Sequence, residues 1–259
     1  MKVIINADDL GYSGGTNDII FELLSHQRIT STTLLANGPA FDDAVRRIPD
    51  YGRFSFGVHL NLTEFSCLTR AQVFFDAGII DEKGIFTGQL LSNWPGAGRA
   101  IKIAVLREWE EQVTKILDYG VRISHFDSHH HIHTLPQLFT TLKKLQKRFS
   151  LRKVRGTFNC DYGEKLRSSP SLLLKKKIWH LALRTYYRTS TTDYFTEFSD
   201  FVESQETCAD IQGTWELMCH PGQPYFPGQK FAVKEKELLW SDWAQRSPGK
   251  IELISYNEL

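Results

Sequence analysis

The chain has 259 residues, of which 41% are hydrophobic and 24% charged. This length is enough to bury a full-sized core, and α/β barrels of similar length often form one domain. The 31 Lys and Arg residues are balanced by 30 Asp and Glu residues, so no global charge favours binding to nucleic acid or to a membrane surface. We therefore expect a small or weakly charged partner.

Short apolar runs alternate with helical patterns along the chain, which predicts repeated βα units around a parallel sheet. Strands are predicted at residues 3–6, 31–37, 54–62, 121–130, 154–158, 215–220 and 251–256, and helices at 16–27, 40–48 and 135–149. Residues 64–100 break the rhythm and read as a loop-rich insertion, and residues 164–213 hold a basic helical piece followed by an irregular segment. No linker divides the chain, so residues 1–259 are expected to form a single barrel domain with loop insertions.

Cysteine usage and the first residues indicate a cellular compartment. Cys67, Cys160, Cys208 and Cys219 are widely spaced and form no CxxC pair, which is typical of reduced thiols in a cytosolic protein. The start, MKVIINADDLGYS, reaches two aspartates within nine residues and so lacks the apolar stretch of a signal peptide. No run of eighteen apolar residues is present. We expect a cytoplasmic protein without a membrane partner.

Polar clusters follow four of the predicted strands. NADD follows the first strand, His59 ends the third, DSHHHIH ends the fourth and CHPG ends a late one. The carboxyl ends of all strands share one face of an α/β barrel, where active sites are built. We therefore expect these clusters, although far apart in the sequence, to meet at one mouth.

The run DSHHHIH at 127–133 carries four histidines in five positions and predicts a metal site. On a strand, His129 and His131 would share one face because side chains alternate. On a helix or turn, His129 and His133 would meet instead. Either geometry offers two imidazoles to a cation. The alternative is a polar loop whose histidines are solvated or hydrogen-bonded to the backbone.

Asp8 and Asp9 are adjacent, so within a strand their side chains would point to opposite faces. Both can reach one site only where the strand ends and the chain turns, and Gly11 and the Ser13–Gly15 segment supply that turn. One carboxylate could then bind a cation while the other stays free as a base. Capping of the next helix is the alternative use of these aspartates.

Three further residues lie near predicted strand ends. His59 is either a core histidine or a second imidazole for the cation, and two imidazoles with one carboxylate make a facial ligand set that leaves positions open. His220 precedes the Pro221–Gly222 turn and suits a general acid near neutral pH, or hydrogen-bonds the backbone. Arg155 could orient a carboxylate, contact the substrate or remain a solvated cation.

Five segments together resemble the YdjC/ChbG-like carbohydrate deacetylases, a family that includes chitooligosaccharide deacetylases. They are NADDLGYS at 6–13, TSTTLLANG at 30–38, GVHLNLT at 57–63, DSHHHIH at 127–133 and ELMCHPG at 216–222. The closing IELISYNEL is also similar to the end of the family's sequences. The resemblance spans nearly the whole chain, whereas residues 64–100 and 160–213, which would shape a sugar pocket, match only loosely.

The resemblance implies an α/β fold, a distorted (β/α) TIM-like barrel related to polysaccharide deacetylases. By motif, Asp9, His59 and His129 look like metal ligands and Asp8 like the catalytic base. The implied reaction removes the acetyl group from an N-acetylated sugar or short oligosaccharide of the N-acetylglucosamine type, with a cation-bound water as the nucleophile. The family also suggests a homodimer.

The remaining roles come from chemistry. His220 would protonate the departing amine, because an amide anion does not leave unaided. Asp127 or Ser128 would hold the histidines in the required tautomer, with His131 and His133 as further candidate ligands and Arg155 as a substrate-binding residue. Aromatic residues that could stack on a sugar, or else fill the core, are Trp94, Trp109, Tyr162, Tyr186, Tyr187, Tyr225 and Phe226.

The ion and the reaction keep alternatives open. Nitrogen ligands with one carboxylate suit Zn²⁺, whereas Mg²⁺ prefers oxygen, yet the resembled family is usually described as magnesium-dependent. Either divalent cation is therefore expected as the cofactor. The rival functions are a metal-dependent hydrolase of another amide, ester or phosphate, and a non-catalytic sugar-binding protein with the same fold.

Overall fold

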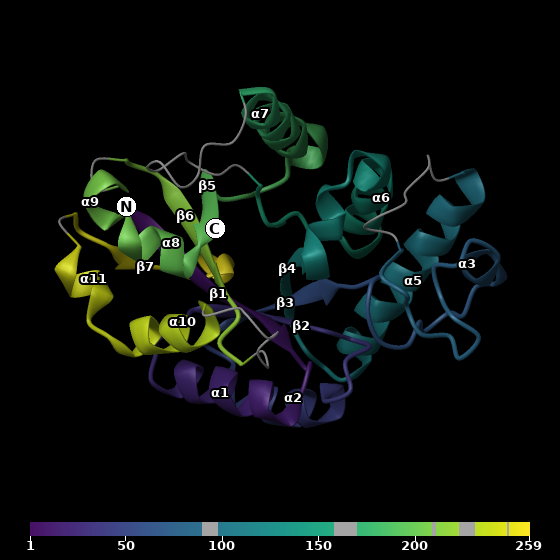
Figure 1. Ribbon diagram of the computed structural model, residues 1–259, viewed down its shortest axis with the longest axis horizontal. Helices are drawn as coiled ribbons and strands as arrows, with labels where there is room; N and C mark the ends of the chain where they lie inside the picture. Colours follow the sequence, from purple (N-terminus) through teal and green to yellow (C-terminus); the bar gives the residue numbers. More distant parts are fainter. Residues whose placement is uncertain (90–97, 158–169, 209–210, 223–230, 248) are drawn as a thin grey trace.

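The strands form one parallel sheet at the centre of the molecule (Figure 1). The computed structural model describes residues 1–89, 98–157, 170–208, 211–222, 231–247 and 249–259. Its strands are β1 (Lys2–Leu10), β2 (Ser31–Leu34), β3 (Ser55–Leu60), β4 (Ile123–Ser128), β5 (Tyr194–Glu197), β6 (Thr214–Cys219) and β7 (Glu252–Leu253). Their order is β4-β3-β2-β1-β6-β5, and β7 pairs with β1.

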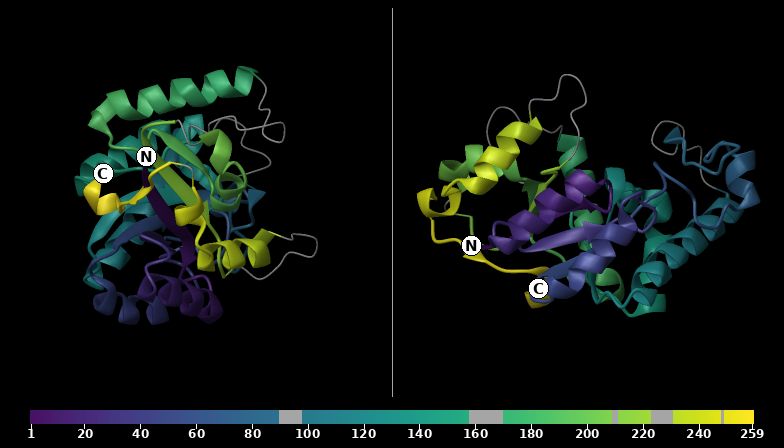
Figure 2. Two further views of the ribbon diagram at one scale, coloured as in Figure 1. Left: turned by 90° about the vertical axis from the view of Figure 1, so that its left-hand side faces the viewer. Right: turned by 90° about the horizontal axis from the view of Figure 1, so that it is seen from below.

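Helices surround this sheet in all three ribbon views (Figures 1 and 2). The α-helices are α1 (Gly14–Ser25), α2 (Phe41–Arg47), α3 (Gln72–Asp76), α5 (Arg99–Asp118), α6 (Phe139–Phe149), α7 (Pro170–Thr185), α8 (Phe198–Glu203), α9 (Gln205–Cys208), α10 (Phe231–Trp240) and α11 (Trp243–Arg246). Short 3₁₀ helices include η2 (His129–Thr134), which follows β4 directly, and η5 (Tyr186–Arg188). None of the helices among the described residues combines the length and the apolar character needed to cross a bilayer.

Regular strand pairing does not close the sheet into a complete barrel. Single parallel bridges, Phe126 with Val154 and Lys153 with Ser190, instead join β4 to the residues that precede β5. At the other end of β1, β7 pairs with Lys2 and Val3. β6 pairs with the same two residues, so β7 must occupy the β2 edge of β1, where β2 begins its pairing only at Asn6. The expected distorted barrel is therefore present, and two of its strand positions are occupied by only a few residues.

The sequence predictions differ from the structure in the later part of the chain. The strand predicted at 154–158 is only a bridge at Val154 within the described residues, and the one predicted at 251–256 is reduced to β7. β5 lies in a segment expected to be irregular, and the long helix α5 follows the predicted insertion without having been predicted itself. The strands are short, so tertiary pairing decides them. In α5 the buried residues Val105, Trp109 and Val113 do follow a helical spacing, so a signal for this helix was present in the sequence.

The central strand β1 is buried along nearly its whole length, with Val3, Ile4 and Ile5 fully enclosed. Burial on both faces is expected for a parallel strand that helices cover. The interior also contains polar and charged side chains, however. The fully buried polar and charged side chains include Asn6, Asp9, Ser31, Thr32, Thr33, Asp127, Arg155 and Glu216. Buried polar groups require partners, and these lead to the candidate site.

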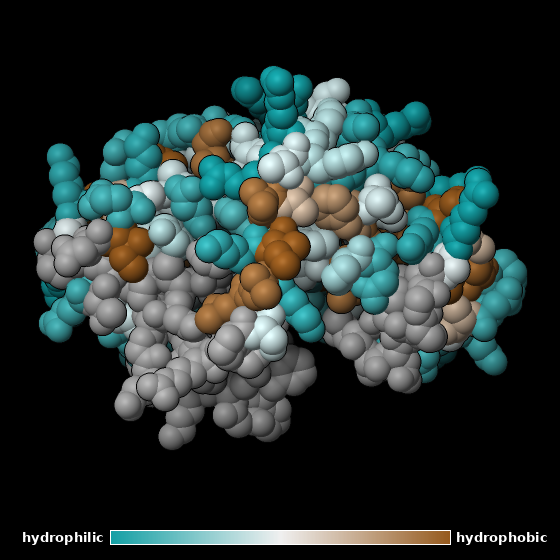
Figure 3. Space-filling model, turned by 90° about the horizontal axis from the view of Figure 1, so that it is seen from above, coloured by the Kyte–Doolittle hydropathy of each residue, from teal (hydrophilic) through white to brown (hydrophobic). Residues whose placement is uncertain are grey.

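The two ends of the described chain are held together. The Met1 amino group donates to the Lys250 carbonyl at 3.0 Å, and the last residues continue beside β1 (Figure 2). Tyr256 is completely buried, stacked on His125 with ring centroids 3.5 Å apart. At the top of the molecule in Figure 1, α7 leaves Leu174, Ile178 and Leu181 more than half exposed, and hydrophobic side chains gather in the middle of that face (Figure 3).

Candidate active site

The histidine run leaves β4 in an unusual backbone turn. His130 and His131 have φ values of 51° and 54° inside η2, in the left-handed region that non-glycine residues seldom adopt. The run is therefore neither a strand nor a regular helix, and neither predicted pairing within it is formed. His129 is brought to the site and His130 lies beside it, with ring centroids 4.1 Å apart, whereas His131 and His133 turn elsewhere.

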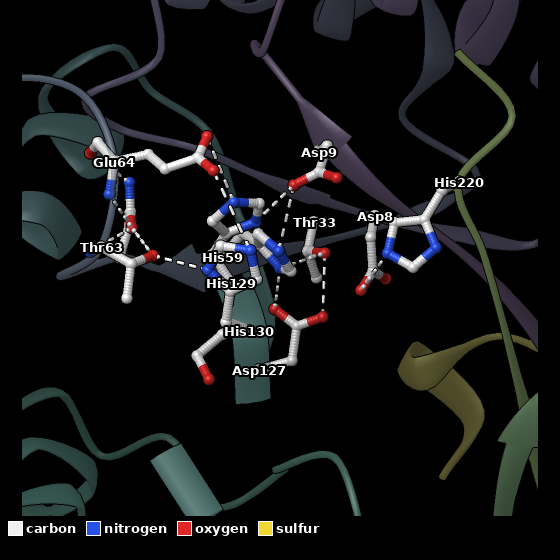
Figure 4. Close-up of polar contacts among 12 residues, drawn as sticks. Asp8, Asp9, Thr33, His59, Thr63, Glu64, Asp127, His129, His130 and His220 are labelled. Carbon is white, nitrogen blue, oxygen red and sulfur yellow. Dashed lines mark hydrogen bonds and ion pairs between the residues drawn. The ribbon is translucent and has the colours of Figure 1, made fainter. Parts of the chain in front are cut away.

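Asp9 also adopts a left-handed conformation, with φ 69°, at an irregularity in the pairing of β1 with β2. This break in the alternation allows adjacent carboxylates to face one region, although it occurs within β1 rather than after it. Figure 4 shows Asp8 between Asp9 and His220. Both carboxylates can reach one site only if the chain turns, and the left-handed backbone conformation of Asp9 provides that turn.

Asp9, His59 and His129 form a buried cluster in which one donor atom from each lies within 4.8 Å of the others. Asp9 Oδ1 is 2.9 Å from His129 Nδ1 and 3.3 Å from His59 Nε2 (Figure 4). His59 Nε2 is buried and has no hydrogen-bond partner in the described part of the chain. A buried, unpaired nitrogen beside a carboxylate is what a cation site offers when its ligands are ready.

Two other groups of donor atoms have similar spacing, but only one of them is free of a neutralising guanidinium. Asp8, His59 and Asp127 come together, but the Arg155 Nη2 atom lies 2.6 Å from Asp8 and 2.9 Å from Asp127, so a guanidinium already neutralises that group. Glu64, His129 and His130 form the second group, nearer to the surface. The Asp9–His59–His129 cluster is the more completely buried of the two groups that lack a protein cation.

Both histidines of the cluster are backed by a carboxylate. His59 Nδ1 is 2.8 Å from Asp127 Oδ1, and Thr33 donates to the other Asp127 oxygen at 2.9 Å. On the far side, His129 Nε2 lies 3.5 Å from Glu64 Oε2. For His59, a carboxylate that accepts from Nδ1 leaves Nε2 as a lone-pair donor, which is the tautomer that a metal ligand needs. His129 Nε2 makes no hydrogen bond within the described part of the chain, so Glu64 acts on it through charge.

The charges of this cluster shift the pKa of each member. Burial alone would lower the pKa of His59, but Asp127 and Asp9 raise it to about 10. Burial likewise opposes protonation of His129, but Asp9 and Glu64 raise its pKa to about 9. Burial would raise the pKa of Asp9, yet the two histidines hold it well below its usual value. The pocket therefore strongly favours positive charge beside Asp9.

Arg155 lies beneath the site rather than on its surface, since its side chain is 0% exposed. Its guanidinium donates to both oxygens of Asp8, at 2.7 and 2.6 Å, and its Nε donates to Glu216 Oε1 at 2.7 Å. Of the three uses weighed from the sequence, it orients a carboxylate. The expected direct contact with substrate is not available to a side chain enclosed in this way.

Asp8 is consequently fixed and ionised. Burial would raise its pKa, but the Arg155 guanidinium holds it well below the usual value for aspartate. Asn6 donates a further hydrogen bond to Asp8 Oδ1 at 2.8 Å. His220 also lies close to this carboxylate, with its Nε2 3.8 Å from Asp8 Oδ2.

His220 follows β6 and keeps 35% of its side chain exposed, so it can meet a molecule that enters the mouth. Its backbone N–H donates to Glu235 Oε2 at 2.8 Å. The turn after it packs tightly, because a Cβ on Gly222 would lie only 2.6 Å from the Thr16 Cα. Thr16 also donates to the Gly222 carbonyl at 3.0 Å. These contacts hold Gly222 against the start of α1.

His131, His133 and Ser128 lie apart from the cluster. His133 Nδ1 is 2.5 Å from Ser128 Oγ, which also accepts from the His133 backbone N–H at 2.9 Å. Ser128 therefore holds His133 rather than a histidine of the cluster. His131 packs edge-on against Phe195, with ring centroids 5.6 Å apart. Neither histidine belongs to any of the three groups of closely spaced donors found among the described residues.

Three of the seven aromatic candidates lie in the described part of the chain. Trp109 is completely buried in α5, so it fills the core. Tyr186 and Tyr187 lie in η5 beside the Lys147 ammonium. The other four aromatic candidates lie outside the described residues: Trp94, Tyr162, Tyr225 and Phe226.

Comparison with known proteins identifies the family. Residues 2–247 match the model of a family described as YdjC-like protein. The chain belongs to this family. This YdjC-like protein is 36% identical to a carbohydrate deacetylase of Listeria monocytogenes serotype 4a over 270 residues, 100% of both chains. It is 33% identical to a carbohydrate deacetylase of Halalkalibacterium halodurans over 225 residues, 85% of each chain.

A solved structure supports the fold of this YdjC-like protein. It is described as a candidate cellobiose-phosphate cleavage protein from Enterococcus faecalis V583, with a TM-score of 0.73 and 22% identity, covering 99% of this chain and 98% of that one. At this identity the likeness establishes the fold alone.

Four residues of the site were not singled out from the sequence: Thr33, Glu64, Glu216 and Tyr256. Glu64 follows the GVHLNLT segment directly, and Glu216 lies two and four residues before Met218 and His220, on one face of a strand. A charged residue inside the apolar run WELMC was the available signal. The sequence around Tyr256 offers no such signal, because the hydroxyl of Tyr256 donates to Glu216, which lies 40 residues away in the sequence.

Proposed function

We propose that this YdjC-like protein is a metal-dependent hydrolase that removes the acetyl group from an N-acetylated sugar or short oligosaccharide of the N-acetylglucosamine type. The observation that carries the proposal is the cluster of Asp9, His59 and His129 next to an ionised carboxylate, Asp8, and a partly exposed histidine, His220. Relatives named carbohydrate deacetylases, matched along most of the chain, support the substrate class.

The cluster fits a divalent cation, and Asp9, His59 and His129 would hold it. Two imidazoles and one carboxylate suit Zn²⁺ and related ions, whereas Mg²⁺ requires more oxygen ligands, which waters would have to provide. The unpaired His59 Nε2 and the negative Asp9 beside it support either ion. When bound, a divalent cation polarises a carbonyl and makes a coordinated water more acidic.

Asp8 is proposed as the proton acceptor. It is ionised at neutral pH, and the two hydrogen bonds from Arg155 fix the plane of its carboxylate. The same pairing lowers its basicity, so Asp8 can act only on a water made more acidic than bulk water. A free carboxylate next to the ligand Asp9 serves that purpose, whereas a protein that merely binds sugar has no need of one.

His220 is proposed as the proton donor to the departing amine. Amine loss from the tetrahedral adduct requires protonation of nitrogen, and His220 is exposed on the side of Asp8 opposite the cluster (Figure 4). Acceptor and donor therefore flank the position where the amide bond would lie. The acetate group faces the cluster and the amine faces His220.

The test is acetate release from N-acetylglucosamine oligomers by protein stripped of metal and then supplied with Zn²⁺ or Mg²⁺. We expect acetate only when a divalent cation is present. Turnover of another amide, ester or phosphate without acetate release would support the rival hydrolase. Sugar binding with no turnover under any cation would support a non-catalytic protein.

A further inference from the structure

His129 has a carboxylate on each side of its ring. Its Nδ1 lies 2.9 Å from Asp9 Oδ1, within the buried cluster, and its Nε2 lies 3.5 Å from Glu64 Oε2 (Figure 4). The Nε2 atom is buried and makes no hydrogen bond within the part of the chain that the structure describes. An unpaired imidazole nitrogen that faces a carboxylate is available to a cation. The use of Nδ1 in the cluster does not account for this second nitrogen.

A second imidazole reaches the same carboxylate. His130 Nε2 lies 3.9 Å from Glu64 Oε1, and donor atoms of Glu64, His129 and His130 all lie within 4.8 Å of one another. We call these three residues the outer set, and Asp9, His59 and His129 the inner set. Each set offers two imidazoles and one carboxylate, which suit a divalent ion of the Zn²⁺ type.

Hydrogen bonds fix which nitrogen of His130 is free. The side-chain oxygen of Asn61 accepts from the backbone N–H and from the hydroxyl of Thr63, at 2.9 and 3.0 Å. Because the Thr63 hydroxyl gives its hydrogen to Asn61, it can only accept from His130 Nδ1, which lies 2.9 Å away. A neutral His130 therefore keeps its hydrogen on Nδ1 and presents the lone pair of Nε2 on the side of Glu64. This is the tautomer that a metal ligand at Nε2 needs.

The outer set is the more accessible of the two. The side chains of Glu64 and His130 are 30% and 40% exposed, whereas those of Asp9 and His59 are 0% and 1% exposed. His129, which belongs to both sets, is 6% exposed. An ion that reaches the buried inner set needs an entry path and must exchange its waters for protein ligands. The outer set offers such ligands at the solvent side of His129.

The shared histidine prevents both sets from being complete at the same time. A neutral imidazole has one lone-pair nitrogen and one N–H. When Nε2 of His129 binds an ion, the hydrogen is on Nδ1 and faces Asp9. When Nδ1 binds an ion, the hydrogen is on Nε2 and faces Glu64. An ion that moves inward therefore leaves behind an outer set that has lost one ligand, so the two sets act in sequence.

We propose that Glu64, His129 and His130 form a second cation-binding site, which captures a divalent ion of the Zn²⁺ type before the ion moves to the inner set. This rests on the proposed function, because it takes the inner set as the final position of the metal. A site on the entry path changes the rates of binding and release by the same factor. It therefore leaves the final affinity unchanged, unlike a residue that supports an inner ligand.

The experiment follows the uptake of Co²⁺, a coloured substitute for Zn²⁺, by metal-stripped protein in a stopped-flow spectrometer. For the wild type, we expect a fast phase whose rate rises with Co²⁺ concentration and a slow phase whose rate does not. His130→Asn should lose the fast phase, while its final affinity for Co²⁺ in a chelator competition stays that of the wild type. Asn is chosen because His130 has φ 51°, a conformation that Asn tolerates better than most residues.

His131→Asn is the matched control. It makes the same substitution at a left-handed residue of the same turn, φ 54°, which lies outside both sets, and it should keep both phases. A second pair tests the orientation of His130. Thr63→Val removes the hydroxyl and should slow the fast phase, whereas Thr63→Ser keeps the hydroxyl and should restore it. Thermal unfolding of the metal-free proteins checks that each variant is folded.

The outcomes separate this inference from the proposed function. Uptake by the wild type in a single phase, with a rate that rises linearly with Co²⁺ concentration, would overturn the inference and leave the deacetylase proposal standing. A fast phase that persists in His130→Asn would do the same. A wild type that binds no Co²⁺ would remove the proposed metal-dependent function, and this inference with it.

Discussion

Arg155 and Asp8 are joined by two parallel hydrogen bonds, Nη1 to Oδ2 at 2.7 Å and Nη2 to Oδ1 at 2.6 Å, although 147 residues separate them in the sequence. The pair is buried, and Arg155 is also bound to Asp127 and Glu216. Removing one member of a buried pair leaves an uncompensated charge. Arg155 therefore connects Asp8, the candidate base, with Asp127, which is hydrogen-bonded to His59. It also connects Asp8 with Glu216, which is hydrogen-bonded to Tyr256.

Replacing Asp8 with Asn should abolish most of the acetate release. The amide keeps the shape of the side chain but cannot accept the proton, and loss of a general base typically lowers kcat by about 10²- to 10⁴-fold. Metal content measured on the same sample should be unchanged, because Asp9 remains. Loss of metal in Asp8→Asn would mean that the roles of the two aspartates are exchanged, and exposed Asp50→Asn serves as the control.

Replacing His59 with Ala should lower the amount of cation that the purified protein retains. His59 Nε2 faces Asp9 and has no other partner in the described chain, so its removal takes away one of three protein ligands. Metal content per chain and affinity in a chelator competition report the loss. The control His26→Ala removes an exposed imidazole. Equal metal content in the two variants would place His59 outside the coordination sphere.

Replacing Glu64 with Gln should weaken metal binding without removing a ligand. Glu64 lies 3.5 Å from the outer nitrogen of His129, and loss of such a support typically costs about 10- to 100-fold in affinity. The matched control is Glu82→Gln, an exposed acid in a nearby turn. The same affinity in both variants would show that Glu64 does not orient His129.

Replacing His220 with Ala should slow the hydrolysis of an amide more than that of an activated aryl ester. An aryl oxide leaves without protonation, whereas an amine does not. The ratio of the two kcat values is the measurement, and stability should change little because the side chain is partly exposed. Equal losses on both substrates would argue against His220 as the proton donor.

Glu216 predicts a pH dependence of stability. Burial raises its pKa from 4.5 to about 7, against the opposing effects of Arg155 and Tyr256. The folded state then binds more protons than the unfolded state between these values, so the free energy of unfolding falls as pH rises from about 4.5 to 7.

Urea unfolding across this pH window measures the slope for the wild type and for Glu216→Gln. Gln keeps one oxygen, which can accept from Arg155, and its amide N–H can donate to the Tyr256 hydroxyl in place of the lost acceptor. The variant cannot titrate at this position, so its slope should be less negative. The exposed control Glu237→Gln should behave as the wild type does. Identical slopes in all three proteins would contradict a raised pKa for Glu216.

The sequence by itself determined the parallel α/β class and the end of the sheet where the polar motifs lie. Apolar runs at β1, β3 and β6 specify buried strands, and a polar cluster that directly follows such a run has to emerge at its carboxyl end. His59 and His220 could therefore be placed at one mouth from their positions alone. Local pattern is enough for this, because side-chain alternation and strand order depend on neighbouring residues.

The family motifs named Asp9, His59 and His129 together, but only the tertiary structure showed how these side chains meet. The left-handed turns at Asp9, His130 and His131 redirect side chains in ways that alternation cannot foresee, so His59 rather than His131 or His133 provides the second imidazole. Arg155 likewise changed from a candidate substrate contact to a buried partner of Asp8, because its hydrogen bonds cross most of the chain. Contacts of this kind follow from backbone dihedral angles and long-range packing, which no short segment encodes alone.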